Sequence, residues 1–298
     1  MTPPLLHLEQ ARCSVAGATV LDNVTLCTTG DRVGLSGKTL GLRALLTGEA
    51  TLISGQAMVL GQSLSEARKN CLFGCAVALS HVPKKWTIRR VLELAAQIGG
   101  RSVTDAASRA AFAADEIGEA ALLTRRWSTA APIERALAAL ALGVVTDPPM
   151  LFVSPPFGVL SSDHCERYGA ALTRAAQDRK LLLEIARSPE DSSEQSWVKS
   201  LTSISYVFDG RDTGSGEPLR PGQARYILRV VGNAMEVGAA LQRVAARTWP
   251  IHAPSDWTRG RCAFLVDVDR DANGVADTGA LLDVCIQSAL PILELLPV

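Results

Sequence analysis

Apolar positions along the chain fall into two kinds of segment. Short apolar runs, typical of buried strands, occur at residues 20–28, 32–35, 150–153 and 181–185. Apolar residues at three- and four-residue spacing, typical of amphipathic helices, occur at residues 40–46, 87–98, 104–123 and 133–144. Because strands and helices alternate in this way, we predict an α/β fold with parallel strands and crossover helices.

The pattern restarts after a Gly- and Pro-rich segment, residues 210–222, which we interpret as a turn leading into a linker. Beyond it, strands are predicted at residues 225–231, 249–252, 261–267 and 291–298, and helices at residues 235–247 and 278–289. The order β-α-β-β-α-β is that of small ferredoxin-like α/β domains. The sequence therefore predicts two domains, residues 1–218 and residues 219–298.

Residues 5–212 resemble the ATPase subunit of ABC transporters in the order and spacing of short motifs. The matching pieces are residues 21–26 and 31–35 (strands around the phosphate loop), Gly37-Lys38-Thr39 (the end of Walker A), 86–94 (the start of the helical subdomain), 127–135 (the signature) and 146–158 (Walker B). The resemblance implies an ABC ATPase-like (P-loop NTPase) fold with a helical subdomain at about residues 84–132. The C-terminal segment is similar to the extension of bacterial ABC-2 exporter and gliding-motility ATPase subunits.

The phosphate loop is the first motif that departs from the family. A working loop has the form GxxxxGK[ST], and its glycines let backbone N–H groups wrap the β-phosphate. Here Arg32 stands where the first Gly is required, and about five residues are missing between Leu35 and Gly37. Gly37, Lys38 and Thr39 remain as a vestigial cofactor-binding site. We expect either a crippled anion site or a plain strand-to-helix turn.

The other motifs lack the groups on which ATP hydrolysis depends. Where the resemblance places the Mg²⁺-binding Asp and the catalytic Glu of Walker B, the chain has Ser154 and Pro155. The remaining family positions hold Val15 (adenine-stacking aromatic), His81 (in a segment without the usual Gln), Ala131-Pro132-Ile133 (signature), Ser161 (Asp of the loop that contacts the dimer partner) and Arg187 (switch His). At the signature, the β-branched Ile133 replaces a Gly that lets the backbone approach a γ-phosphate.

Losses of this kind have a large effect on affinity. A hydrogen bond to a charged group contributes about 1.5–3 kcal/mol, so losing three or four would cost roughly 5–10 kcal/mol. Such a change turns micromolar affinity into millimolar or weaker affinity. We therefore expect no ATP hydrolysis, no cofactor, and no catalytic or metal-binding residue.

The resemblance and these losses together predict an inactive pseudo-ATPase subunit of a membrane ABC exporter. It would dock on a permease and pair with an active ATPase subunit or with itself, peripheral to the inner membrane on its cytoplasmic side. Two alternatives stay open. The first is an ATPase with displaced catalytic groups, whose turnover would vanish in Lys38→Ala. The second is a scaffold or interaction protein unrelated to transport.

Composition and charge favour a cytoplasmic protein that does not bind nucleic acid. Lys+Arg and Asp+Glu both number 30, so no global basic field is available. The longest apolar stretch, residues 136–145, is shorter than the roughly 20 residues that span a bilayer. The seven cysteines form no CxxC pair, which is typical of reduced, buried thiols. Cys71 and Cys75 would share a helix face, where packing is favoured over a two-ligand metal site.

Two polar segments have alternative interpretations. The basic run at residues 84–90 is either a solvated helix start or a contact for the permease, whose groove the resemblance places nearby. Residues 269–277 follow the first nine positions of an EF-hand loop, but Ala280 replaces the bidentate Glu. We favour a polar turn in which Asp277 or Thr278 caps the last helix, with weak calcium binding as the alternative.

Overall fold

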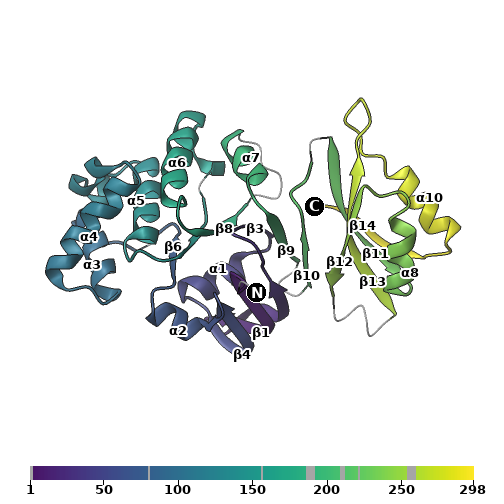
Figure 1. Ribbon diagram of the computed structural model, residues 1–298, viewed down its shortest axis with the longest axis horizontal. Helices are drawn as coiled ribbons and strands as arrows, with labels where there is room; N and C mark the ends of the chain where they lie inside the picture. Colours follow the sequence, from purple (N-terminus) through teal and green to yellow (C-terminus); the bar gives the residue numbers. More distant parts are fainter. Residues whose placement is uncertain are drawn as a thin grey trace.

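The protein is elongated, with a helical end, a central β region and a C-terminal α/β unit at the opposite end (Figure 1). The structure, a computed structural model, describes residues 3–79, 81–155, 157–185, 192–208, 212–220, 222–253 and 260–298. Strands and helices alternate as the apolar pattern predicts, so the expected α/β fold is confirmed.

Parallel strands form the central sheet. The described ones are β3 (Arg32–Gly37), β6 (Phe73–Ala76), β7 (Met150–Val153), β8 (Lys180–Glu184) and β9 (Ser203–Phe208). Their order is β9-β3-β8-β7-β6, and each neighbouring pair is parallel. Every residue of β7 is apolar and buried, as expected for a strand that is covered on both faces. The carboxyl ends of these strands meet at one edge of the sheet.

A smaller antiparallel sheet packs beside the parallel one. Its strands are β1 (Leu6–Val15), β2 (Ala18–Cys27), β4 (Thr51–Val59) and β5 (Gln62–Ser63), in the order β2-β1-β4-β5. Helix α1 (Leu40–Thr47) contributes Leu42, Leu45 and Leu46 to a core that also contains residues of β1, β3 and β7. The two sheets therefore share one core around α1.

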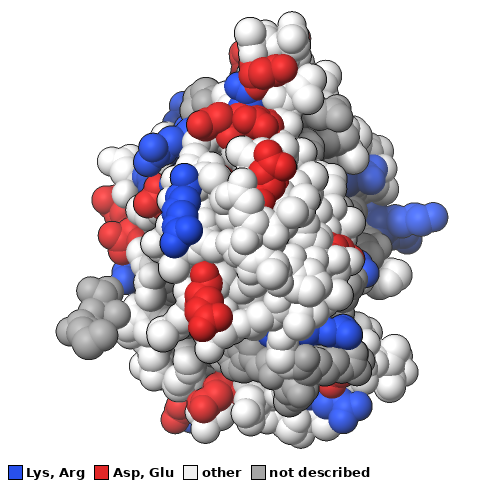
Figure 2. Space-filling view, turned by 90° about the vertical axis from the view of Figure 1, so that its right-hand side faces the viewer, with Lys and Arg blue, Asp and Glu red and all other residues white. Residues whose placement is uncertain are grey.

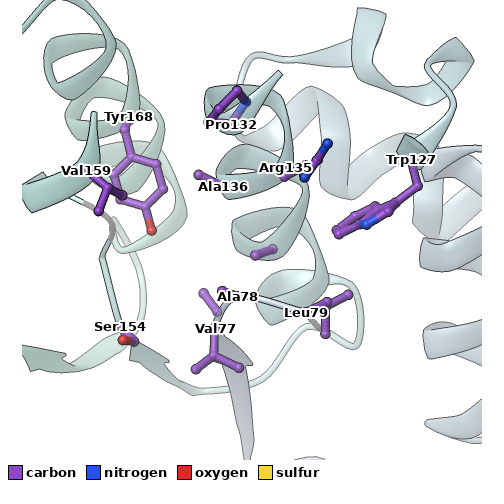
Figure 3. Close-up of a pocket in the computed structure, with 12 residues that line it drawn as sticks. Val77, Ala78, Leu79, Trp127, Pro132, Arg135, Ala136, Ser154, Val159 and Tyr168 are labelled. Carbon is purple, nitrogen blue, oxygen red and sulfur yellow. The ribbon is translucent and has the colours of Figure 1, made fainter. Parts of the chain in front are cut away.

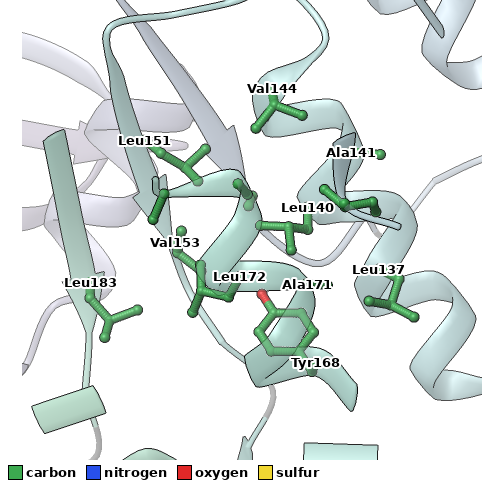
Figure 4. Close-up of a cluster of buried hydrophobic side chains, with 14 of the residues drawn as sticks. Leu137, Leu140, Ala141, Val144, Leu151, Val153, Tyr168, Ala171, Leu172 and Leu183 are labelled. Carbon is green, nitrogen blue, oxygen red and sulfur yellow. The ribbon is translucent and has the colours of Figure 1, made fainter. Parts of the chain in front are cut away.

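The helices include those that the apolar spacing predicts near residues 87–98, 104–123 and 133–144. They are α2 (Leu64–Lys69), α3 (Ile88–Ile98), α4 (Val103–Glu116), α5 (Pro132–Val144), α6 (Ser162–Ala175) and α7 (Ser192–Lys199), with 3₁₀ turns η1 (Ala120–Thr124), η2 (Trp127–Thr129) and η3 (Phe157–Val159). Of these, α2, α6 and α7 were not predicted. Thr87 and Ser102 begin α3 and α4, where their side chains accept backbone N–H bonds from Arg90 and Asp105. Leucines of α5 and α6 pack against β7 and β8 (Figure 4).

The C-terminal unit has the predicted order of elements. These are β11 (Gln223–Val231), α8 (Ala234–Leu241), β12 (Arg247–His252), β13 (Arg261–Asp269), α10 (Gly279–Gln287) and β14 (Ile292–Pro297). The strand order β14-β11-β13-β12 is antiparallel throughout, which is the ferredoxin-like arrangement. Viewed from this end, positive and negative side chains are interspersed around a largely uncharged centre (Figure 2).

The predicted linker contains a strand that joins the two parts. Strand β10 (Asp212–Gly216) pairs with β9 on one side and β12 on the other, so the described strands of both parts form one ten-stranded sheet. The interpretation of residues 210–222 as a turn and linker is wrong for this stretch, while Gly210 and Arg211 lie outside the described residues. The boundary at residue 218 stays a prediction.

A buried ion network holds the C-terminal unit against β9. Arg225 of β11 donates to Asp267 of β13 at 2.5 and 2.8 Å and to the Tyr206 hydroxyl at 2.8 Å. Arg247 contacts the same carboxylate at 2.8 Å, and both guanidinium groups lie over the Trp249 ring. The side chains of Arg225 and Asp267 are 2% and 0% exposed.

Candidate functional site

The segment that the resemblance matches to the end of the phosphate loop, residues 37–39, forms a tight connection between β3 and α1. Gly37 ends β3 with a φ of 87°, and a Cβ atom on it would lie 2.4 Å from the carbonyl oxygen of Val207. The Lys38 N–H donates to this same carbonyl at 2.9 Å, and the Thr39 N–H donates to Gly37 at 3.0 Å. In a working loop such amides point at the phosphates. Here the Lys38 amide extends the pairing of β3 with β9.

A cavity of about 340 Å³ lies between the β3–α1 connection and the C-terminal unit. Its near side is formed by residues 36–38 and by Val207 and Phe208 of β9. Its far side includes Arg229 of β11 and Glu294 of β14, which form an ion pair at 2.9 Å. A ligand that enters this cavity beside Lys38 therefore also meets β11 and β14.

An arginine lies at the edge where the resemblance places Mg²⁺. Arg43 is on α1, and its guanidinium lies 3.5 Å from the Ser154 hydroxyl and 3.8 Å from the Glu184 carboxylate. Ser154 follows β7 and Glu184 ends β8, so Arg43 bridges the carboxyl ends of two neighbouring strands. Glu184 and Arg43 neutralise each other, so the pair carries no net charge. The Glu184 carboxylate, a group that could hold a metal ion at this edge, is already engaged by Arg43.

The signature segment forms the first turn of α5. The Ala131 N–H donates to the Glu134 carboxylate at 2.8 Å, and Pro132 has no N–H. Glu134 also pairs with Arg125 at 3.0 Å. The Ile133 side chain, which stands where the family has a Gly, is buried in the core with 2% exposure. The carboxylate of Glu134, rather than a bulky side chain, occupies this helix start.

The remaining predicted positions are spread over the same part of the molecule. Val15 is half-buried at the end of β1, and His81 is exposed. Ser161 is exposed at the start of α6, where its side chain makes no capping hydrogen bond. Arg187 lies outside the described residues. Among the predicted positions, the structure therefore brings Ser154, but not His81, into contact with Arg43 at the carboxyl edge of the parallel strands.

A larger groove lies between the sheet and the helical end. It has a volume of about 670 Å³ and is lined by parts of α1, α2, β6, α3 and α5. Leu79 and Ile98 are the most exposed apolar side chains in its lining, at 38% and 79%. The groove lies at the C-terminal end of α3, whereas the exposed basic run at residues 84–90 lies at the N-terminal end of this helix.

The metal alternatives find little support in the geometry. Cys71 lies in a turn and Cys75 in β6, so the expected shared helix face is wrong. The Asp271 carboxylate accepts N–H bonds from Asn273 and Val275 and closes a local turn. Thr278 precedes α10 without a side-chain cap, contrary to one expectation. Within the described ranges, no three His, Cys, Asp or Glu residues are grouped to hold a metal ion.

Solved structures of ABC transporter cassettes resemble this fold. A nucleotide-free ATP-binding cassette from an ABC transporter matches with a TM-score of 0.59 at 12% identity, over 72% of this chain and 92% of its own. A dimeric bacterial ABC transporter cassette matches with a TM-score of 0.55 at 16% identity, over 69% and 95% of the two chains. The chain has the ATP-binding cassette fold. At these identities the likeness to the two cassettes concerns the fold.

The ADP conformation of another ABC transporter cassette matches this chain equally well, with a TM-score of 0.57 at 15% identity over 72% of this chain and 92% of its own. No protein-family model matches the sequence, and no curated protein matches it. The likeness to the solved cassettes confirms the P-loop NTPase type of fold that the short motifs predict. Within the described residues of this cassette, no helix has the length and apolarity needed to cross a membrane.

Two residues at the carboxyl ends of β7 and β8, Arg43 and Glu184, were not predicted from the sequence. Arg43 follows Thr39 by four residues on the same helix, so its position on the loop side of α1 could have been inferred from helical spacing. Glu184 ends an apolar strand and carries no motif that marks it. Its contact with Arg43 depends on the order of the strands, which only the fold supplies.

Proposed function

We propose that the chain is a catalytically inactive cassette, a structural or regulatory subunit of a membrane ABC exporter complex. The observation that carries the proposal is the Lys38 amide, which is bonded to Val207 rather than left open to a phosphate. Two further contacts support the proposal independently: Arg43 engages Ser154 and Glu184 at the Walker B edge, and the Glu134 carboxylate accepts the Ala131 N–H at the start of α5, where the family's signature meets a phosphate.

Docking on a permease is the second part of the proposal. The groove between the sheet and the helical end offers exposed apolar side chains, Leu79 and Ile98, beside backbone at the end of β6. Exposed apolar groups that line a hollow are typical of protein interaction sites. Pairing with an active ATPase subunit, or with a second copy, would take place on another face of the same cassette.

Site-specific photo-crosslinking tests the docking. A benzoyl-phenylalanine at position 98 should crosslink to a multi-spanning membrane protein in cells, because Ile98 lies in the groove. The matched control is position 286 on α10, where Ile286 is equally exposed at 72% but lies on the C-terminal unit. Crosslinks from position 98 to soluble proteins alone would favour the scaffold alternative.

Glu184 is the one observation that favours the displaced-ATPase alternative. It is a carboxylate of low exposure at the edge that carries the catalytic Glu in the family, although Arg43 neutralises it. An ATP turnover assay on the parent chain, Lys38→Ala and Glu184→Gln distinguishes an inactive cassette from an ATPase with displaced catalytic groups. We expect no turnover above a blank in any of the three proteins. Turnover in the parent chain that is lost in both variants would make the protein an ATPase.

A further inference from the structure

A second cavity, of about 270 Å³, lies directly beside the Walker B edge. It is enclosed by the end of β6, by η2 and by the facing sides of α5 and α6 (Figure 3). Most of its lining is apolar: Ala76, Val77, Ala78, Leu79, Trp127, Pro132, Ala136, Ala139 and Val159. Its size and apolar walls suit a compact ring system and do not suit a triphosphate.

A polar group, the hydroxyl of Tyr168, faces this cavity. Tyr168 of α6 is 1% exposed, and its ring is held edge-to-face by Phe157 at 5.6 Å. Its hydroxyl makes no hydrogen bond with any described residue, and Figure 3 shows the hydroxyl end of the ring on the cavity side. Burial raises the pKa of Tyr168 well above its ordinary value, so the phenol stays neutral and can donate a hydrogen bond.

A positive charge stands at the opposite wall. Arg135 of α5 lines the cavity, is exposed, and forms no ion pair within the described part of the chain. The neighbouring Glu134 does not neutralise it, because that carboxylate is used by the Ala131 N–H and by Arg125. The guanidinium can therefore hold a carboxylate at the rim of the cavity.

We propose that this cavity binds a small aromatic carboxylic acid that carries a second polar group. The ring lies between Trp127, Ala136 and Val159, the carboxylate meets Arg135, and the second polar group bonds to the Tyr168 hydroxyl. Placing that group against Tyr168 gives the phenol a hydrogen-bond partner inside the cavity. The inference goes beyond the inactive cassette and does not depend on ATP or on a permease, so either proposal can fail alone.

Calorimetric titration with 6-hydroxy-2-naphthoate tests the inference on the full chain. Two related probes remove one polar group each: 2-naphthoate lacks the hydroxyl, and 6-hydroxy-2-naphthamide lacks the negative charge. Probes of about 14 non-hydrogen atoms at ordinary ligand efficiency bind with a Kd of roughly 0.1–1 mM. We expect one site per chain and about tenfold weaker binding when either polar group is removed.

Two variants assign the polar contacts. Arg135→Gln should abolish the preference for the acid over the amide and keep the preference for the hydroxylated probe. Tyr168→Phe should do the reverse. Ala136→Phe fills the cavity and should abolish binding of all three probes, whereas Ala239→Phe on the exposed side of α8 should change nothing. If Ala136→Phe does not fold, the exposed Arg135 variant still carries the test. No saturable binding to the parent chain, or unchanged preferences in Arg135→Gln and Tyr168→Phe, would overturn the inference.

Discussion

Asp267→Asn should destabilise the protein strongly, because it leaves a buried guanidinium without its counter-charge. Asp267 accepts hydrogen bonds from Arg225 through both carboxylate oxygens, at 2.5 and 2.8 Å, and also contacts Arg247. Burial lowers the pKa of Arg225, but its interactions with Asp267 and with the Tyr206 hydroxyl together outweigh this effect and hold the pKa above its ordinary value. Because an arginine guanidinium is not deprotonated in proteins, Arg225 stays charged when the carboxylate is removed.

The magnitude follows from what Arg225 keeps. It retains the Tyr206 hydroxyl and the Glu217 carbonyl, both at 2.8 Å, and the face of Trp249. It loses both charge-assisted bonds to Asp267, and the amide nitrogen of asparagine turns a donor toward the remaining donors. Removing one partner of a buried ion pair typically costs about 3–5 kcal/mol. For a chain of this size that corresponds to a fall in Tm of roughly 6–10 °C.

Urea unfolding followed by tryptophan fluorescence and far-UV circular dichroism measures this effect. The control is Glu93→Gln, which also changes a carboxylate to an amide, in a helix-surface ion pair with Arg90 at 3.8 Å whose side chains are 18% (Glu93) and 52% (Arg90) exposed. Surface pairs of this kind contribute less than about 1 kcal/mol. If Asp267→Asn costs no more than Glu93→Gln, the buried network does not hold the C-terminal unit as argued.

Two further predictions concern packing and thiol chemistry. Gly74→Ala should lower the free energy of unfolding by about 3 kcal/mol or more, because the new Cβ would lie 1.7 Å from the Gly143 carbonyl oxygen. The control is Gly169→Ala in α6, whose Cβ would meet only an ordinary contact at 3.6 Å, so this variant should be neutral or stabilising. Thermal denaturation measures both. Burial raises the pKa of Cys75 to about 12 and that of Cys13 to about 11, so at pH 8 their thiolate fractions are low and iodoacetamide should modify the exposed Cys27 first. Their labelling should become faster as the pH rises, and peptide mass spectrometry that finds Cys75 or Cys13 modified as fast as Cys27 at pH 8 would contradict the burial.

Local pattern was sufficient for much of the fold. The spacing of apolar residues placed α3 within one residue of its start and its end, because a helix with one buried face must repeat at that period. The order of elements in the C-terminal unit was likewise predictable, since each strand there is bounded by a turn or a helix. Strand β10 was not predictable, because its Gly-rich sequence forms a strand only between β9 and β12.

The candidate site shows the same limit. Sequence spacing identified Ser154 as the residue at the Walker B position, but its contact with Arg43 joins residues 111 positions apart. The bond from Lys38 to Val207 also depends on which strand lies beside β3. Likewise, Ile133 matches a motif position, yet only the packing of α5 decides that its side chain points into the core. Tertiary contacts, which no short motif encodes, settle each of these points.

Titration of the purified chain with Mg-ATP to several millimolar tests the central claim most directly. A competent ABC ATPase subunit, measured in the same buffer, serves as the positive control. Because the Lys38 amide is bonded to Val207 and Arg43 engages Ser154 and Glu184 at the Walker B edge, we predict no saturable heat with this chain while the control binds. Saturable binding that is lost in Lys38→Ala would contradict the account and show that the shortened loop still holds a nucleotide.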